Sequence, residues 1–262
     1  IKFIEAFLYE KKYIFNIFYC ESLNIYNNVN IFKKPLEYID FNEKISLNKN
    51  YRQQKNIIDF SNRFCENANE YIKTLRNNVN RDLYKKSNSI LKNGITSQIV
   101  KVDDLEDQIN AILWEIEYLV KNKGLDYGDI AIVFPYNKKK LKNGKTIYFQ
   151  YLLRKALDDV NIPYIIGDDD LTKHAKKTGI TLSNLYFIKN LEYKAVVFCE
   201  LEMLYNQTIN KEDQDYQIND FIGDLNKIYM VINRASEYLT ITTTFNENSS
   251  ELIKILVNSI NT

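Results

Sequence analysis

Short apolar runs alternate with longer amphipathic stripes over most of this chain, and that alternation limits the possible folds more than any other feature. One stripe covers residues 105–120, follows Asp103 and Asp104, and stops before Gly124. Acidic residues before a helix and a glycine after it are common boundary signals, so a helix is expected here. The run DIAIVF at 129–134 follows, and it is apolar enough to be a strand that is buried on both faces.

The same alternation continues toward the C-terminus. A second stripe over 149–160 leads into a short predicted strand at 164–166. Further strands are predicted at 97–102, 179–183, 195–198 and 238–243, and further helices at 54–75, 220–235 and 249–260. Strands separated by helices of this length are typical of a parallel α/β sheet. The polar stretches 136–145 and 205–219 are predicted to be loops.

Composition excludes several classes of protein. The chain is 45% hydrophobic and 26% charged, which is typical of a globular protein with a core and not of a disordered one. No apolar run approaches the roughly 20 residues that a membrane helix needs, so no membrane contact is expected. Lys and Arg number 35 against 34 Asp and Glu, which gives a net charge of +1. Any contact with nucleic acid must therefore come from local patches of positive charge.

Cysteine and histidine are scarce. Cys20, Cys65 and Cys199 show no CxxC spacing, and His174 is the only histidine. This pattern favours a reducing compartment, such as the cytoplasm, and argues against a disulfide framework. It also argues against a Cys/His zinc site, and no metal site is predicted within the chain.

Residues 47–58 read LNKNYRQQKNII, a run that leads into a predicted helix. This run is similar to the fourth motif of the UvrD/Rep/PcrA-type superfamily 1 helicases, L-x-x-N-Y-R-S. The resemblance implies that Tyr51 stacks on the adenine of ATP and that Arg52 reaches its γ-phosphate. The residue types suit these roles, because an aromatic face stacks on a base and a guanidinium neutralises phosphate charge.

Residues 180–198 read ITLSNLYFIKNLEYKAVVF and resemble the fifth motif of that family, T-x-H-x-x-K-G-L-E-[FW]-x-x-V. The resemblance implies that Glu192 binds the nucleotide ribose. Two positions depart from the motif, because Tyr186 stands in place of His and Asn190 in place of Gly. The same resemblance implies contacts to DNA from Asn184, Tyr186 and Lys189.

Residues 225–235 read LNKIYMVINRA and look like the sixth motif, R-L-x-Y-V-A-x-T-R-A, with Asn233 in place of Thr. The resemblance implies that Arg234 is a second arginine directed at the γ-phosphate. Farther upstream, residues 18–26 weakly resemble the third motif, but Cys20 and Leu23 replace its Asp and Gln. Four motifs in the family's order predict a RecA-like fold, in which a parallel sheet is flanked by helices.

A complete phosphate-binding loop is not expected in this chain. Gly144, Lys145 and Thr146 imitate the end of a Walker A motif, but the first loop glycine would fall at Lys139. Glu200 and Glu202 could imitate a Walker B pair, yet Glu200 simply continues the fifth motif. The resemblance therefore implies that ATP and Mg²⁺ are held mainly by a separate, first RecA-like domain.

The sequence predicts a second RecA-like domain over 47–262, preceded at 1–46 by a remnant of the previous domain or a connecting segment. The chain begins with Ile1 and not Met, so it is expected to be a piece of a longer protein. The resemblance implies an ATP-dependent DNA helicase, with single-stranded or partly duplex DNA and a first RecA-like domain as partners. This chain alone is expected to be incomplete for ATP hydrolysis.

Two other functions remain open. The domain could be a catalytically degenerate module that serves as a scaffold in a nuclease, repair or defence complex, as the changes at Leu23, Tyr186 and Asn190 suggest. It could also be an unrelated α/β enzyme, although no complete catalytic constellation is present. The lysines of 138–145 could follow nucleic-acid phosphates, but a solvated loop is the simpler interpretation. The acidic run at 168–170 could recruit a metal, but a helix N-terminus or turn is the simpler interpretation. His174 is expected to be an exposed residue without a catalytic role.

Overall fold

The fold is described from a computed structural model of the 262-residue chain. The structure describes residues 20, 23, 43, 45–75, 82–92, 94, 97–137, 139–140, 146–167, 178–205, 214–247 and 249–260. The predicted upstream remnant at 1–46, the acidic run at 168–170, His174 and the Gly144-Lys145 pair fall largely or wholly outside these residues.

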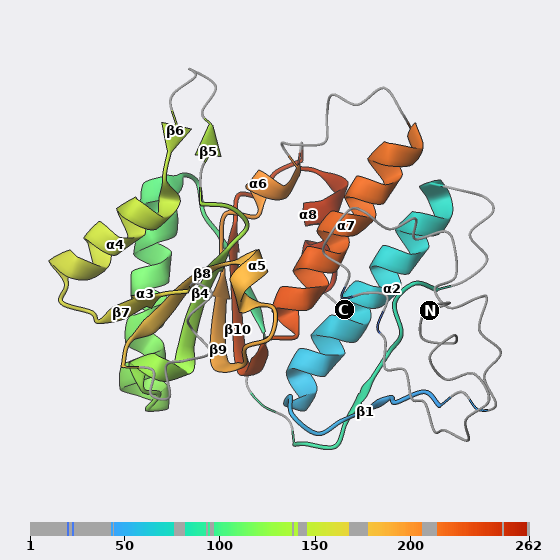
Figure 1. Ribbon diagram of the computed structural model, residues 1–262, viewed down its shortest axis with the longest axis horizontal. Helices are drawn as coiled ribbons and strands as arrows, with labels where there is room; N and C mark the ends of the chain where they lie inside the picture. The colour runs from blue at the N-terminus through green and yellow to red at the C-terminus, as the bar shows by residue number, and fades with distance from the viewer. Residues whose placement is uncertain are drawn as a thin grey trace, which may run out of the picture.

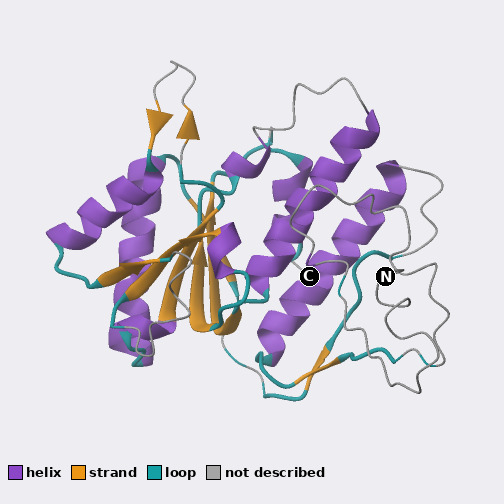
Figure 2. Ribbon diagram, viewed as in Figure 1, coloured by secondary structure: helices purple, strands orange, loops and turns teal. Residues whose placement is uncertain are grey.

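A six-stranded sheet forms the centre of the domain, with the strand order β3-β10-β9-β4-β8-β7 (Figures 1 and 2). Every neighbouring pair in it runs parallel. The six strands are β3 (Gln98–Lys101), β4 (Ile130–Phe134), β7 (Tyr164–Ile166), β8 (Ile180–Asn184), β9 (Tyr193–Phe198) and β10 (Ala235–Thr243). The predicted α/β fold with a parallel sheet is confirmed.

Helices cover both faces of this sheet (Figure 1). One face carries α2 (Lys55–Leu75), α5 (Leu185–Ile188), α7 (Gln214–Ile232) and α8 (Glu251–Asn258). The other face carries α3 (Leu105–Lys123) and α4 (Phe149–Asp159). Two short helical elements in the described part of the chain are the helix α6 (Glu202–Tyr205) and the 3-10 turn η2 (Tyr127–Asp129). Two small strand pairs lie outside the main sheet: β1 (Lys49–Asn50) runs parallel to β2 (Asn88–Ser89), and β5 (Lys139–Lys140) runs antiparallel to β6 (Thr146–Ile147).

Strand β4 explains why the sheet needs cover on both sides. Its side chains alternate between the faces, so Ala131 and Val133 enter the core under α2 and α7. Ile130, Ile132 and Phe134 enter the core under α3 and α4. All five residues of the strand are fully buried. A continuous apolar run of this kind is stable only in the middle of a sheet that is covered on both faces.

Several predicted boundaries are confirmed by the local geometry. Asp104 caps α3 by accepting a hydrogen bond from the backbone N–H of Asp107. Gly124 ends this helix in the left-handed conformation with φ of 70°.

Other predictions differ from the structure: β9 begins at Tyr193 and not at 195, and the predicted loop 136–145 contains β5, which pairs with β6. The two largest differences lie at the two ends of α7. Helix α7 begins at Gln214, inside the predicted loop 205–219, because buried Ile218 and Ile222 extend its apolar stripe.

The second difference lies at the end of α7. The helix stops at Ile232 and β10 begins at Ala235, not at the predicted 238. Ala235 pairs with Tyr193 of β9, and the register then shifts before Tyr238 pairs with Ala195. Because of this irregularity, the first residues of β10 do not alternate strictly between the two faces, and the sequence pattern does not predict them as strand. The connection from α7 to the sheet is therefore very short, and Arg234 lies within it.

Candidate nucleotide half-site

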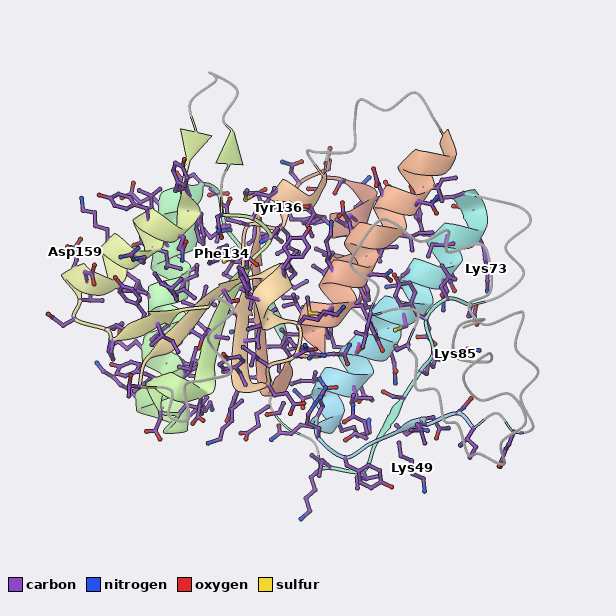
Figure 3. All side chains as sticks on the ribbon, in the orientation of Figure 1. Lys49, Lys73, Lys85, Phe134, Tyr136 and Asp159 are labelled. Carbon is purple, nitrogen blue, oxygen red and sulfur yellow. The ribbon has the colours of Figure 1, made fainter. Side chains whose placement is uncertain are left out.

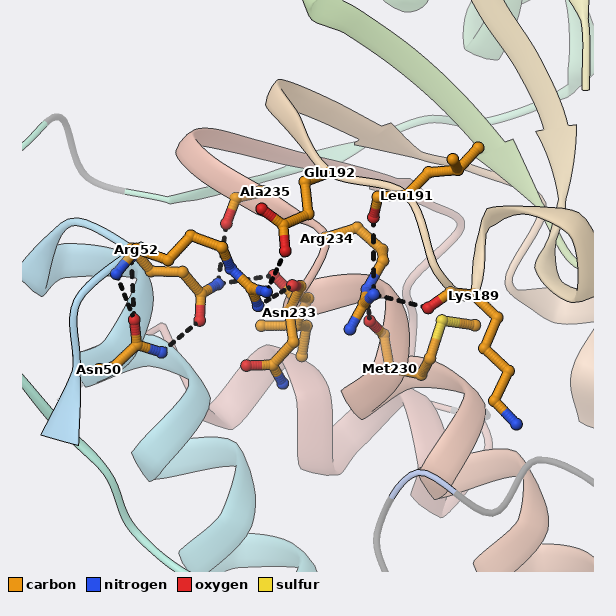
Figure 4. Close-up of polar contacts among 11 residues, drawn as sticks. Asn50, Arg52, Lys189, Leu191, Glu192, Met230, Asn233, Arg234 and Ala235 are labelled. Atoms are coloured by element: carbon orange, nitrogen blue, oxygen red, sulfur yellow. Dashed lines mark hydrogen bonds and ion pairs between the residues drawn. The ribbon is translucent and has the colours of Figure 1, made fainter. Parts of the chain in front are cut away.

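Arg234 lies just before β10, where the C-terminus of α7 meets the amino edge of the sheet. It is buried, with only 8% of its surface exposed. Its Nε donates a hydrogen bond to the carbonyl of Met230 at 3.1 Å. Its Nη1 donates to the carbonyls of Lys189 at 2.6 Å and Leu191 at 3.5 Å (Figure 4). Within the described residues, Nη2 has no hydrogen-bond acceptor. The backbone therefore fixes the plane of the guanidinium and leaves one edge available.

Arg52 reaches the same place from a distant part of the chain. Its Nη2 donates to the carbonyl of Asn233 at 2.8 Å, one residue before Arg234. Its Nη1 forms an ion pair with the carboxylate of Glu192, which directly precedes β9 (Figure 4). Arg52, Glu192 and Arg234, here called the arginine cluster, thus come from three segments that meet at the amino ends of β9 and β10.

Two polar residues that the sequence analysis missed hold Arg52 in position. Gln53 is fully buried, and its Nε2 donates to the carbonyl of Ala235 at 2.8 Å. The Asn50 side chain accepts hydrogen bonds from the backbone N–H groups of Arg52 and Gln53, both at 3.0 Å, and its Nδ2 donates to Gln53 Oε1 at 2.9 Å. An Asn two residues before Arg52 is a signal for a local side-chain turn, and it could have been noticed in the sequence.

The electrostatics of the arginine cluster favour an anion. Burial lowers the pKa of Arg234, nearby positive Arg52 lowers it further, and Glu192 opposes both effects. Two guanidinium groups therefore lie near the same carboxylate, that of Glu192. Because Arg52 and Glu192 are partly exposed, with side chains 37% and 51% exposed, a phosphate could replace Glu192 as the partner of Arg52.

Tyr51 is 66% exposed and immediately precedes Arg52. Its ring is accessible enough to stack on a planar ligand, as the predicted contact with adenine would require. The structure thus places all four predicted nucleotide residues in one region.

The three predicted DNA contacts lie along a single crossing of one face of the sheet. Asn184 ends β8 at the carboxyl edge, and its side chain caps α5 by accepting from the backbone N–H groups of Tyr186 and Phe187. Tyr186 is 38% exposed on α5. Lys189 follows α5, and its carbonyl accepts the hydrogen bond from Arg234. The segment that would contact DNA is therefore bonded directly to an arginine of the cluster.

No group of acidic, cysteine or histidine side chains that could hold a metal ion occurs among the described residues. Glu202 is instead used within the fold, where it accepts hydrogen bonds from the hydroxyl of Thr243 and from the backbone N–H of Thr244. This use agrees with the interpretation that Glu200 and Glu202 are not a Walker B pair. None of the described helices has the length and apolar character to cross a membrane.

The six-stranded parallel sheet and its two helical layers are those of a RecA-like α/β domain. The sequence profile of the UvrD-like helicase C-terminal domain matches residues 45–170. Over these residues the chain is therefore similar to the C-terminal domain of the UvrD-like helicases.

Several curated relatives are named as a subunit of an ATP-dependent helicase/deoxyribonuclease. The proteins from Bacillus cereus strain AH187 and Bacillus anthracis are each 28% identical to this chain over 120 residues, and that from Bacillus cereus strain G9842 is 29% identical. The matches cover 45% of this chain but only 10% of each relative. A solved structure, the C-terminal domain of a possible DNA helicase from Lactobacillus plantarum WCFS1, is 16% identical with a TM-score of 0.46, and the alignment covers 78% of this chain and 93% of that one.

Proposed function

We propose that this domain is the second half of the ATP site of a DNA helicase and forms part of its track for single-stranded DNA. The observation that carries the proposal is the convergence of Arg52, Glu192 and Arg234 at one edge of the sheet. A first RecA-like domain would hold Mg²⁺ and the phosphates of ATP. Closure of the two domains would then bring the arginine cluster against the γ-phosphate.

The ion pair between Arg52 and Glu192 suggests how the half-site changes on closure. Without nucleotide, Glu192 neutralises Arg52. When the γ-phosphate arrives, Arg52 exchanges its carboxylate partner for a phosphate oxygen, and Glu192 becomes available to accept a hydrogen bond from the ribose. Arg234 needs no such exchange, because its Nη2 edge already has no acceptor among the described residues. Charge that develops on the phosphoryl group is stabilised by both guanidinium groups.

The DNA part of the proposal is supported by the position of α5 and its flanking residues. Asn184, Tyr186 and Lys189 offer an amide, an aromatic ring and a cation, which are groups that bind bases and phosphates of a single strand. The hydrogen bond from Arg234 to the Lys189 carbonyl provides a physical connection between the two ligands.

None of the three cysteines forms a disulfide, which agrees with a reducing compartment such as the cytoplasm.

The first experiment compares two proteins: this chain alone, and the product of the natural reading frame extended upstream of Ile1. The chain alone should hydrolyse ATP very slowly, with or without oligo(dT), because it cannot position Mg²⁺ and water. The longer protein should show ATPase activity that oligo(dT) stimulates. Vigorous turnover by the chain alone would contradict the proposal, as would a folded longer protein that neither binds nor hydrolyses ATP.

A scaffold without turnover is the second candidate, and one observation favours it. Both arginines already have protein partners, so the domain is electrostatically satisfied without nucleotide. A scaffold would give a longer protein that binds DNA or protein partners and shows no ATPase activity. Replacing Tyr186 with the family's histidine also separates the two functions. The change Tyr186→His should strengthen DNA stimulation of a motor and have no effect on a scaffold.

A further inference from the structure

Lys227 is a buried lysine that the proposed nucleotide half-site does not use. It lies on α7, and its side chain is only 4% exposed, beside that of Asp224 at 6%. Its Nζ donates hydrogen bonds to Asp224 Oδ1 at 2.7 Å and to the hydroxyl of Tyr136 at 3.2 Å. The same ammonium lies 5.8 Å from the centre of the Tyr136 ring. These three residues are here called the lysine latch.

Stability alone does not explain the lysine latch. Taking two charges out of water is costly, and apolar residues of similar volume often do as well or better at such positions. In the sixth-motif pattern R-L-x-Y-V-A-x-T-R-A, the leucine position corresponds to Lys227 in this chain. A leucine there would fill the same space without a charge. The lysine therefore provides something that a leucine cannot, namely a hydrogen bond to Tyr136.

Tyr136 lies just after β4, at the carboxyl edge of the sheet (Figure 3). The next residue, Asn137, accepts a hydrogen bond from Asn184 Nδ2 at 3.4 Å. Asn184 in turn accepts a hydrogen bond from the backbone N–H of Tyr186 at 2.9 Å, so a chain of contacts connects the loop after β4 to Tyr186. The lysine latch therefore reaches the loops at the ends of β4 and β8, where two of the three predicted DNA contacts lie.

The same helix carries the latch and leads to the arginine cluster. Ile232, the last residue of α7, follows Lys227 by five residues, which is about 7.5 Å along the helix axis, and Arg234 comes two residues later. Helix α7 continues from Lys227 to Ile232, and the side chain of Arg234 is bonded to its last turn, because Nε donates to the carbonyl of Met230. A displacement of the helix at Lys227 therefore also displaces the residues that hold Arg234.

We propose that Lys227 is a positioning residue, which fixes Tyr136 and the loop after β4 and so joins the DNA-facing carboxyl edge of the domain to α7, the helix that ends two residues before Arg234. The role in DNA binding rests on the proposed function. The positioning role itself is a claim about this fold and can be tested without ATP. Its ligand is single-stranded DNA, recognised by the exposed ring of Tyr186 and the amides of Asn137 and Asn184.

The test uses the protein from the extended reading frame and a double variant, Lys227→Leu with Asp224→Asn. The second change avoids leaving an unpaired buried carboxylate. The matched control is Lys254→Leu with Glu251→Gln, which removes a partly exposed pair at the same helical spacing on α8. A third variant, Tyr136→Phe, keeps the ring and removes the hydroxyl that accepts from Lys227.

Two measurements are made on each variant: hydrogen exchange of residues 135–137 and 184–188, and binding of fluorescent oligo(dT). The double variant should exchange faster in both segments and bind oligo(dT) about tenfold more weakly, as expected for the loss of one base-stacking contact. Tyr136→Phe should change both in the same direction, and the α8 control should match the wild type. Unchanged exchange in a folded double variant would overturn the positioning role. A wild-type protein that binds no oligo(dT) would instead refute the proposed DNA track, and the exchange result would still decide the role of Lys227.

Discussion

The two arginines of the cluster are held in very different ways. Arg52 is partly exposed, and its ion pair with Glu192 lies in solvent. Arg234 is buried and donates to three backbone carbonyls. Exposed ion pairs contribute little to stability, whereas buried carbonyls that lose their donor are costly. Arg234 therefore has a structural role in addition to any role in catalysis.

This difference predicts unequal costs in the free energy of unfolding. Arg52→Ala should lower it by less than about 1 kcal/mol, as for other surface pairs. Arg234→Ala should lower it by about 1–3 kcal/mol, because the carbonyls of Lys189, Leu191 and Met230 lose their shared donor. Urea denaturation of this chain alone measures both values. Equal costs would show that the carbonyl contacts of Arg234 do not matter in solution.

At the residue scale, the sequence could predict only part of the site. The motif residues Tyr51, Arg52, Glu192 and Arg234 could be located because their types and order follow a family pattern. Gln53 could not, because its partner, the carbonyl of Ala235, is distant in the sequence. A buried glutamine has no sequence signature of its own. The same limit applies to Lys227, whose hydroxyl partner lies on another segment, just after β4.

At the scale of elements, helix α3 is anchored to the sheet by a buried carboxylate. Glu115 accepts hydrogen bonds from the hydroxyl of Thr240 at 2.8 Å and from Gln98 Nε2 at 2.9 Å. Burial raises the pKa of Glu115 above its ordinary value of 4.5, and the bonds from Thr240 and Gln98 oppose this rise. Because the folded pKa exceeds the unfolded one, the folded chain binds the proton more tightly. The stability from this group is thus complete below pH 4.5 and decreases as the pH rises through the folded pKa.

The variant Glu115→Gln removes this titration and should change the pH dependence of stability. Relative to wild type, the melting temperature of the variant should rise steadily as the pH increases from 4 toward 7, starting from about pH 4.5. Thermal denaturation of both proteins across this range is the measurement. A difference that stays constant with pH would mean that Glu115 titrates normally in the folded chain.

The elements themselves followed largely from local signals. The cap at Asp104, the left-handed Gly124 and the apolar run of β4 are each encoded within a few neighbouring residues. The start of α7 and the start of β10 are not. Their boundaries depend on burial of Ile218 against the rest of the core and on the pairing of Ala235 with Tyr193. Both are contacts between distant parts of the chain.

At the scale of the whole molecule, the sheet separates two hydrophobic cores, and one cysteine lies in each. Cys65 of α2 lies in the core under α2 and α7, and Cys199 lies in the core under α3 and α4. Burial raises the pKa of the Cys65 thiol to about 12 and that of Cys199 well above its ordinary value. Both thiols should therefore be inert while the two cores are intact.

Thiol counting tests this arrangement in one assay. At pH 8, a thiol reagent such as DTNB should react quickly with exposed Cys20 and very slowly with Cys65 and Cys199. All three should react once the chain is denatured. Rapid reaction of two or three thiols in the native chain would contradict the account of a sheet that is covered on both faces.

The central claim is that Arg234 stabilises charge on a γ-phosphate held by another domain. The test is ATP hydrolysis by the protein from the extended reading frame, with saturating oligo(dT), for wild type, Arg234→Ala and a control, Arg154→Ala, which lies on α4. Arg234→Ala is expected to reduce kcat by roughly 10³- to 10⁵-fold, because it removes a charge that acts mainly in the transition state. Nucleotide affinity should change much less, and Arg154→Ala should behave as wild type. A folded Arg234→Ala protein that hydrolyses ATP at the wild-type rate would contradict the claim.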